Sequence, residues 1–218
     1  MSKKSRRPNR AARHRTAPPP QQKPGRSRRA NLLWLAGVAI AAGLIAATFV
    51  VGGKDGNANA AGPIQVGAKA PRVVGTDVLA DRTIDSKDLA GKNVLYYLNE
   101  GVMCQACLVQ IQALQQKAGE LQRRGLRLVS ITNDDPATLR RAGRDYKITT
   151  PLIADASRAI VKSFGVLGGI PAGVGMHADT ANHTFVLVDR HGRVRFVRDY
   201  PSMWVDVDDL LDELPNVS

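Results

Sequence analysis

Residues 93–107 read NVLYYLNEGVMCQAC, and this stretch decides the fold. Its first six residues are a continuous apolar run of strand length, which is typical of a strand covered on both faces. The chain's two cysteines, Cys104 and Cys107, follow where this strand gives way to a helical pattern. The stretch therefore predicts a buried strand, a cysteine pair and a helix in direct succession.

The helical pattern behind the cysteines has one apolar face. Its apolar positions step by four, three, four and three residues: Cys107, Ile111, Leu114, Ala118 and Leu121. We expect one helix over 103–124, which Gly125 ends in the position that favours glycine.

Strand and helix patterns alternate on both sides of this unit. Strands are expected at 72–78, 93–98, 126–132, 150–154, 183–189 and 194–200, and helices at 103–124, 134–146, 157–164 and 206–214. This order predicts one α/β domain over 68–218, with a central mixed sheet flanked by helices.

The N-terminal segment carries almost the whole net charge of +12. Eleven of the 31 Lys and Arg residues and none of the 19 Asp and Glu residues lie in 1–30. The rest of the chain has twenty basic and nineteen acidic side chains, so it offers no basic stripe for phosphates, and we expect no nucleic-acid partner. Residues 1–30 are predicted to be a disordered basic cytoplasmic tail.

Residues 32–51 (LLWLAGVAIAAGLIAATFVV) contain no charge. As a helix they would span about 30 Å, so a transmembrane helix is predicted over 31–52. The basic residues precede it, which predicts a single-pass cell-membrane protein with a cytoplasmic N-terminus and an extracytoplasmic domain behind a flexible linker at 53–67. Cleavage after 58–60 (ANA), or twin-arginine export through Arg28 and Arg29, remains an alternative with the same destination.

The cysteine pair predicts redox chemistry. Backbone N–H groups at a helix start stabilise a thiolate, so we expect Cys104 to attack and Cys107, one turn on, to resolve. Glu100 is either a proton shuttle to the buried thiol or a solvated side chain. A structural disulfide and a metal half-site stay open as alternatives, although zinc would need two further ligands. No cofactor and no resident metal are expected.

Residues 68–200 resemble the thioredoxin-like superfamily, in the redoxin branch of the alkyl hydroperoxide reductase/thiol-specific antioxidant proteins (peroxiredoxins) and membrane-anchored thiol–disulfide reductases. The resemblance rests on VGAKAPRV (66–73), DLAGKNVLYYL (88–98), CQAC (104–107), TPLIADASRAIVKSFGV (150–166) and TFVLVDRHGRVRF (184–196). It implies a thioredoxin-like fold and thiol-based oxidoreductase activity.

Departures from each branch bear on the reaction. In the peroxiredoxin pattern Pro-x-x-x-Thr-x-x-Cys, with Cys107 as the last residue, Cys104 and Glu100 stand at the Thr and Pro places, and the Arg place near Asn182 holds no Arg. Reductases have a cis-proline before the later strand, and 180–183 contain none. The dithiol favours a membrane-anchored extracytoplasmic thiol–disulfide oxidoreductase, and a thiol peroxidase is the alternative.

A copper-binding module similar to the copper chaperones of cytochrome oxidase assembly is a third reading. Those proteins carry Cys-x-x-x-Cys and a distant His, whereas this chain has one residue fewer between its cysteines, and His177 and His183 do not fall at the expected spacing from Asp189. The expected partners are protein thiols and disulfides or hydroperoxides, an unidentified electron donor or acceptor, and the membrane through residues 32–51.

Overall fold

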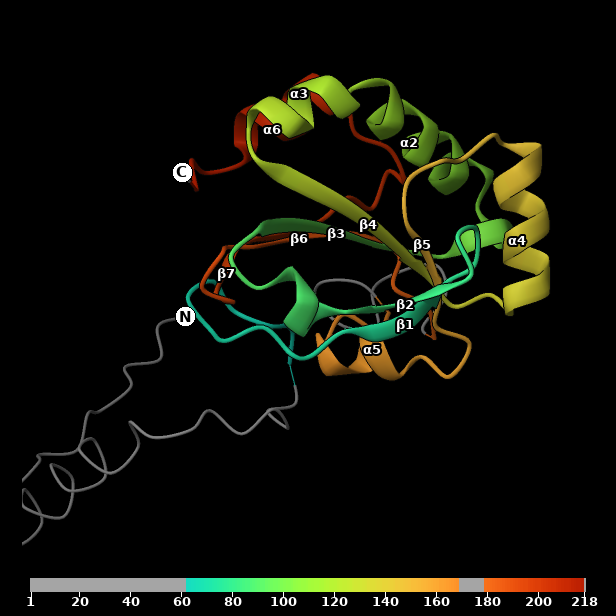
Figure 1. Cartoon of the computed structure of the whole chain (residues 1–218), viewed down its shortest axis with the longest axis horizontal. Coiled ribbons are helices and arrows are strands. Elements are labelled where there is room, and N and C mark those ends of the chain that lie inside the picture. The colour runs from blue at the N-terminus through green and yellow to red at the C-terminus, as the bar shows by residue number, and fades with distance from the viewer. Residues whose placement is uncertain (1–61, 169–178, 218) are drawn as a thin grey trace, which may run out of the picture. The chain divides into compact units, whose positions relative to one another are not determined.

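The structure is a computed structural model that describes residues 62–168 and 179–217. These residues belong to one compact unit, Asp55–Ser218 (Figure 1). The tail at 1–30, the transmembrane segment at 31–52 and most of the linker at 53–67 lie outside the described residues. Among the helices that are described, none has the length and apolar character needed to cross a bilayer.

The centre of the described unit is a seven-stranded sheet with the order β2-β1-β5-β4-β3-β6-β7. Its strands are β1 (Val74–Asp77), β2 (Arg82–Asp85), β3 (Asn93–Asn99), β4 (Leu126–Thr132), β5 (Leu152–Ala154), β6 (His183–Val188) and β7 (Val194–Asp199). Strand β3 pairs in parallel with β4 and antiparallel with β6, so the sheet is mixed, as the sequence predicts.

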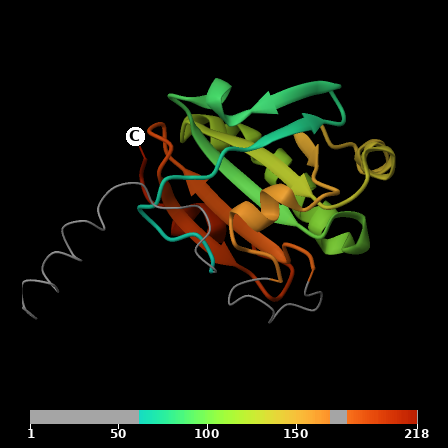
Figure 2. The same ribbon diagram turned by 90° about the horizontal axis from the view of Figure 1, so that it is seen from below.

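Helices cover both faces of this sheet. They are η1 (Ser86–Leu89), η2 (Gly101–Met103), α2 (Gln105–Gln116), α3 (Ala118–Arg123), α4 (Pro136–Asp145), α5 (Ala159–Ser163) and α6 (Val207–Glu213). Buried side chains of α2, α3, α4 and α6 form one apolar cluster with the sheet, and those of α5 belong to a second cluster. Figure 1 shows α2, α3 and α6 above the strands, and Figure 2, seen from below, shows α5 in front of them.

Strand β3 contributes to both clusters, because successive side chains of a strand point to opposite faces. Leu95 and Tyr97 pack into the cluster beneath α2, while Tyr96 and Leu98 pack into the cluster beside α5. The apolar run at 93–98 is thus confirmed as a strand that is buried on both faces. This burial anchors the backbone just before the cysteines.

The single helix predicted over 103–124 is wrong, because the chain divides into η2, α2 and α3. Cys104 has extended backbone angles (φ −120°, ψ 97°), so α2 begins only after it. Lys117 ends α2, and its N–H bonds to the carbonyls of Ala113 and Leu114, a shared bond typical of a helix end.

Strands β1 and β5 are shorter than predicted. They share a single residue pair, Asp77 with Ile153.

Candidate active site

Cys104 is the N-cap residue of α2 and is partly exposed. Its sulfur accepts a hydrogen bond from the backbone N–H of Cys107, with 3.2 Å between Cys107 N and Cys104 Sγ. First-turn N–H groups have no partner within the helix, and they favour negative charge on an atom at the cap. The expectation that Cys104 stands at the helix start is therefore confirmed.

Polar contacts hold the turn between β3 and Cys104 in place. Gly101 has φ +72°, a conformation that favours glycine, and its N–H donates to Asn99 Oδ1 at 2.9 Å. Asp134, beyond the end of β4, accepts the N–H of Val102 at 3.1 Å and the hydroxyl of Thr132 at 2.8 Å. The ends of the two central strands thus fix where α2, and with it Cys104, begins.

Cys107 lies one turn into α2 and is completely buried. Both cysteines are free thiols. Burial, followed by the contact with Cys104, raises the pKa of the Cys107 thiol far above its usual range. At neutral pH Cys107 is therefore a protonated thiol behind a more accessible partner, which agrees with the predicted difference between an outer and an inner sulfur.

Two further side chains contact Cys107, and sequence reasoning assigned neither to the site. His183, the first residue of β6, places Nδ1 3.7 Å from Cys107 Sγ. The hydroxyl of Tyr97, on β3, interacts with the Cys107 side chain and lies 2.8 Å from His183 Nδ1 and 3.2 Å from His183 Nε2. Burial lowers the pKa of His183 to about 3, so its imidazole is neutral at physiological pH.

Glu100 is buried, with 2 % of its surface exposed, so the alternative of a solvated side chain is wrong. Its Oε1 accepts a hydrogen bond from the hydroxyl of Thr180 at 3.1 Å. The role of Glu100 as a proton shuttle stays a prediction.

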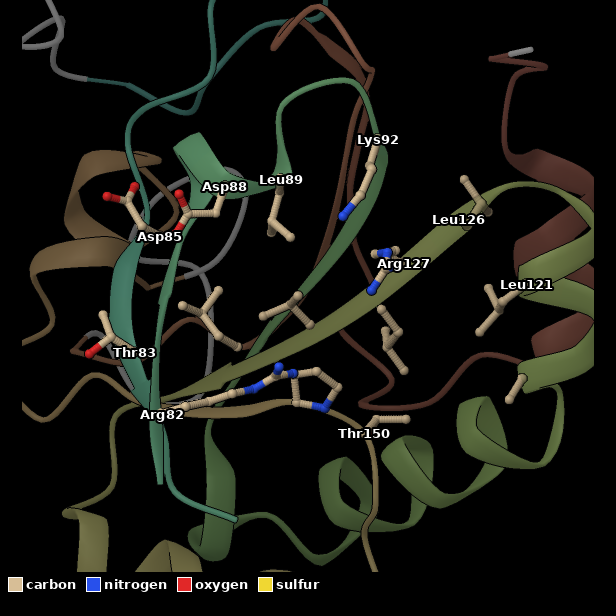
Figure 3. A pocket seen from close by; sticks show the side chains of 15 residues that line it. Arg82, Thr83, Asp85, Asp88, Leu89, Lys92, Leu121, Leu126, Arg127 and Thr150 are labelled. Atoms are coloured by element: carbon tan, nitrogen blue, oxygen red, sulfur yellow. The ribbon is translucent and has the colours of Figure 1, made fainter. Parts of the chain in front are cut away.

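The two thiols are not among the residues that line the cavity beside β2, and the described residues hold no cluster of metal ligands. Within 62–168 and 179–217, no group of three or more His, Cys, Asp or Glu side chains is placed to hold a metal ion. A cavity of about 430 Å³ opens between β2 and the first half of β4, where Arg82, Arg127 and Leu126 line it (Figure 3). Strands β3 and β4 are parallel, the cavity lies at the start of β4, and the cysteines follow the end of β3. The cavity and the cysteines therefore lie toward opposite ends of these strands.

The chain is similar to known proteins over most of its described residues. The sequence profile of the AhpC/TSA family matches residues 66–197. The Peroxiredoxin Bcp of Escherichia coli (strain K12) is 26% identical over 137 residues, which are 63% of this chain and 86% of that protein.

Solved structures show the same fold. The peroxidoxin BcpB of Mycobacterium tuberculosis superposes with a TM-score of 0.58 and 18% identity, over 68% of this chain and 95% of that one. A yeast mitochondrial 1-Cys peroxiredoxin, whose thiol is resolved via glutathione/thioredoxin systems, superposes with a TM-score of 0.56 and 14% identity, over 68% of this chain and 73% of that one. At these identities the likeness concerns the fold alone.

Proposed function

We propose that this chain, which belongs to the AhpC/TSA family, is a dithiol peroxidase that reduces a hydroperoxide at Cys104 and then closes a Cys104–Cys107 disulfide. The peroxiredoxin relatives favour this reading over disulfide exchange as the main activity. The observation that carries it is the position of Cys104, whose sulfur caps α2 and accepts the N–H of the residue that would resolve it.

The proposed reaction has two steps. The Cys104 thiolate attacks one oxygen of the hydroperoxide, the O–O bond breaks, and the other oxygen leaves and takes up a proton as an alcohol or water. Cys104 is then a sulfenic acid. The Cys107 thiol loses its proton and attacks this sulfur, the S–S bond forms, and the departing hydroxide takes up a proton to become water.

The two sulfurs have environments that suit these unequal roles. The attacking sulfur must be reachable by peroxide, and Cys104 is partly exposed. The resolving sulfur must stay unreactive until the sulfenic acid exists, and the raised pKa of Cys107 keeps it a thiol until then.

A stoichiometry experiment tests the proposal. The reduced full chain is mixed with hydrogen peroxide without an electron donor, and peroxide and thiols are counted. We expect one peroxide consumed and two thiols lost per chain. Cys107→Ser should consume one peroxide and keep a sulfenic acid that dimedone traps, while its matched control, Cys104→Ser, should consume none on the same timescale. Peroxide consumption by Cys104→Ser at the wild-type rate would exclude Cys104 as the attacking residue.

Thiol–disulfide exchange is the second candidate, and the C-x-x-C spacing favours it, because both sulfurs lie at one helix start. In that reaction the Cys104 thiolate attacks a protein disulfide and Cys107 releases the product. If the chain does not consume peroxide but reduces insulin disulfides, and this reduction requires both cysteines, its activity is thiol–disulfide exchange instead.

The oxidised pair needs two electrons from external thiols to return to the reduced state. A donor of the thioredoxin or glutathione type fits this need, and systems of both types serve the yeast peroxiredoxin that shares the fold. Turnover with a thioredoxin system, compared with glutathione and glutaredoxin, identifies the class of donor.

The membrane anchor belongs to the proposal as well. The uncharged segment 32–51 and the basic residues before it support a single-pass protein of the cell membrane with its redox domain outside the cytoplasm. Cys107→Ser has one cysteine, so a membrane-impermeant maleimide can report its location in intact cells expressing the full chain. Labelling of Cys104 without lysis is expected, and labelling only after lysis would place the domain in the cytoplasm.

A further inference from the structure

Gln110 determines which nitrogen of His183 carries the proton. Gln110 Oε1 lies 3.0 Å from the backbone N of Val205, and since an N–H can only donate, the amide oxygen must face it. An amide oxygen can only accept, so a hydrogen bond between this oxygen and His183 Nε2, 3.3 Å away, requires the proton on Nε2. The Tyr97 hydroxyl lies 3.2 Å from Nε2 as well, but it can donate or accept and therefore fits either tautomer. The unprotonated nitrogen is then Nδ1, the one 3.7 Å from Cys107 Sγ.

Tyr97 connects the imidazole to the sulfur. Its hydroxyl lies 2.8 Å from His183 Nδ1 and also interacts with the Cys107 side chain. The Tyr97 ring stacks on Phe185, with centroids 4.4 Å apart and an angle of 11° between planes, which holds the hydroxyl in position. An O–H group can turn between two acceptors, so Tyr97 can donate to Nδ1 or to the sulfur.

Cys107, His183, Tyr97 and Gln110 are each 0 % exposed. A proton that leaves the Cys107 thiol therefore has no direct route to bulk solvent, and a lone thiolate would be an uncompensated buried charge. Disulfide formation nevertheless requires that Cys107 lose this proton. Among residues 62–168 and 179–217, the unprotonated basic nitrogen in contact with the sulfur is His183 Nδ1.

We propose that His183 is the general base for resolution: Nδ1 takes the proton of Cys107 as its sulfur attacks the oxidised Cys104 sulfur. This inference rests on the proposed dithiol function. The S–S bond forms while the S–O bond of the sulfenic acid breaks, and the imidazolium then gives its proton to the departing hydroxide, which becomes water. Tyr97 turns its hydroxyl from Nδ1 to the forming thiolate, which frees the nitrogen.

Proton transfer from Cys107 to His183 avoids the free-energy cost of a single buried charge on either side chain. Burial lowers the pKa of His183 and raises that of Cys107, because either charge by itself is poorly solvated. Transfer between them creates both charges at once, 3.7 Å apart, and each compensates the other.

Other titratable groups around the imidazole must be considered in any pH experiment. Asp199, the last residue of β7, accepts the backbone N–H of His183 at 3.2 Å, and Tyr200, which follows it, packs edge-on against the ring with centroids 6.4 Å apart. Glu100 follows β3, and Cys104 caps α2. The test therefore compares variants at each pH rather than one pH profile alone.

The experiment follows resolution without peroxide. The reduced full chain reacts with a stoichiometric amount of 5,5′-dithiobis(2-nitrobenzoate). Attack by Cys104 forms a mixed disulfide and releases one thionitrobenzoate, and attack by Cys107 on that disulfide releases the second. The second release is a first-order step that measures deprotonation and attack by Cys107. Wild type, His183→Asn and Tyr97→Phe are compared from pH 6 to pH 8.

His183→Asn should leave the first release unchanged and slow the second by about 100-fold at pH 7, the size of a typical general-base contribution. Its second rate should rise about tenfold per pH unit, because the thiolate must then form without a base. The wild-type second rate should be nearly flat, since neutral His183 is available throughout this range. Equal second rates in wild type and His183→Asn, or parallel pH profiles, would overturn the inference.

Two further variants guard against a merely structural effect. Tyr97→Phe keeps the stacked ring and should slow the second release about tenfold without adding pH dependence, the loss expected for one hydrogen bond to a charged group. His191→Asn, in the exposed hairpin turn, should behave as wild type. If the wild-type chain fails to consume peroxide but shows these differences, the peroxidase proposal fails and the role of His183 stands.

Discussion

Replacement of His183 should change how the stability of the protein depends on pH. Burial lowers the pKa of this side chain from 6.5 to about 3. As the pH falls below about 6.5, the unfolded chain binds a proton at His183 and the folded chain does not, so unfolding becomes more favourable. This contribution to stability is fully present above about pH 6.5 and decreases down to about pH 3, where the folded state also binds the proton.

The magnitude follows from the size of the pKa difference. Each pH unit between the two values costs about 1.4 kcal/mol, so the reduced protein should lose about 2 kcal/mol from this residue between pH 7 and pH 5. His183→Asn cannot bind the proton. It should be less stable than wild type at pH 7, because it loses contacts with Tyr97 and Gln110, but its free energy of unfolding should fall less between pH 7 and pH 5.

Urea unfolding of the reduced full chain at pH 7, 6 and 5 measures this difference. Comparison of each variant with wild type at the same pH cancels the contributions of the carboxylates. His191→Asn is the matched control, since His191 is exposed, and it should keep the full wild-type decrease. If His183→Asn loses as much stability as wild type between pH 7 and pH 5, His183 is not the neutral buried group that its surroundings indicate.

Three further predictions concern the cysteines and the turn before them. Stability of the reduced protein should fall by up to about 1.4 kcal/mol per pH unit between about pH 9 and pH 10, because the unfolded thiol of Cys107 loses a proton that the folded one keeps, and urea unfolding of Cys107→Ser should lack this fall. At higher pH the raised pKa values of Tyr96, Tyr97 and Tyr200 should add a fall that both proteins share. Iodoacetamide at pH 8 should modify Cys104 well before Cys107, as peptide mass mapping would show; equal modification would contradict the burial of Cys107. Gly101→Ala should lower the free energy of unfolding in urea by about 3 kcal/mol or more, because the new Cβ would lie 1.8 Å from Asp134 Oδ2. The control Gly91→Ala, with φ +79° but open space around its Cβ, should lower it by only about 1 kcal/mol. Similar losses in the two variants would refute the steric argument.

The sequence predicted the elements that depend on local patterns. The apolar run before the cysteines is a strand, and Cys104 stands at a helix start, because both follow from neighbouring residues. The break at Lys117 was missed, since the apolar steps continue across it to Leu121 and the pattern reports a face rather than an unbroken helix axis.

The contact between His183 and Cys107 could not be read from the sequence, because it depends on the register of β6 against β3. Asn99 pairs with His183, and Tyr97 pairs with Phe185, so Tyr97 and His183 become diagonal neighbours on one face of the sheet. A shift of the register by one residue would turn His183 to the opposite face. A histidine at the first position of a buried strand was the one local signal, and its partner is 76 residues away.

The same contact bears on how the oxidised pair is reduced. A donor thiolate that attacks the accessible Cys104 sulfur must expel Cys107 as the leaving group, and a leaving thiolate with a raised pKa in a buried site departs slowly. Protonation of that sulfur as it leaves removes the difficulty, and His183 Nδ1, 3.7 Å from Cys107 Sγ, is placed to pass it a proton that the imidazole takes up during the step. This opening is the reverse of an attack by Cys107 on a mixed disulfide at Cys104, so the group that takes the Cys107 proton in that attack returns it here. His183→Asn should therefore slow both the closing and the opening of the disulfide and leave its reduction potential little changed, whereas a change in Cys104 alone would alter the first attack.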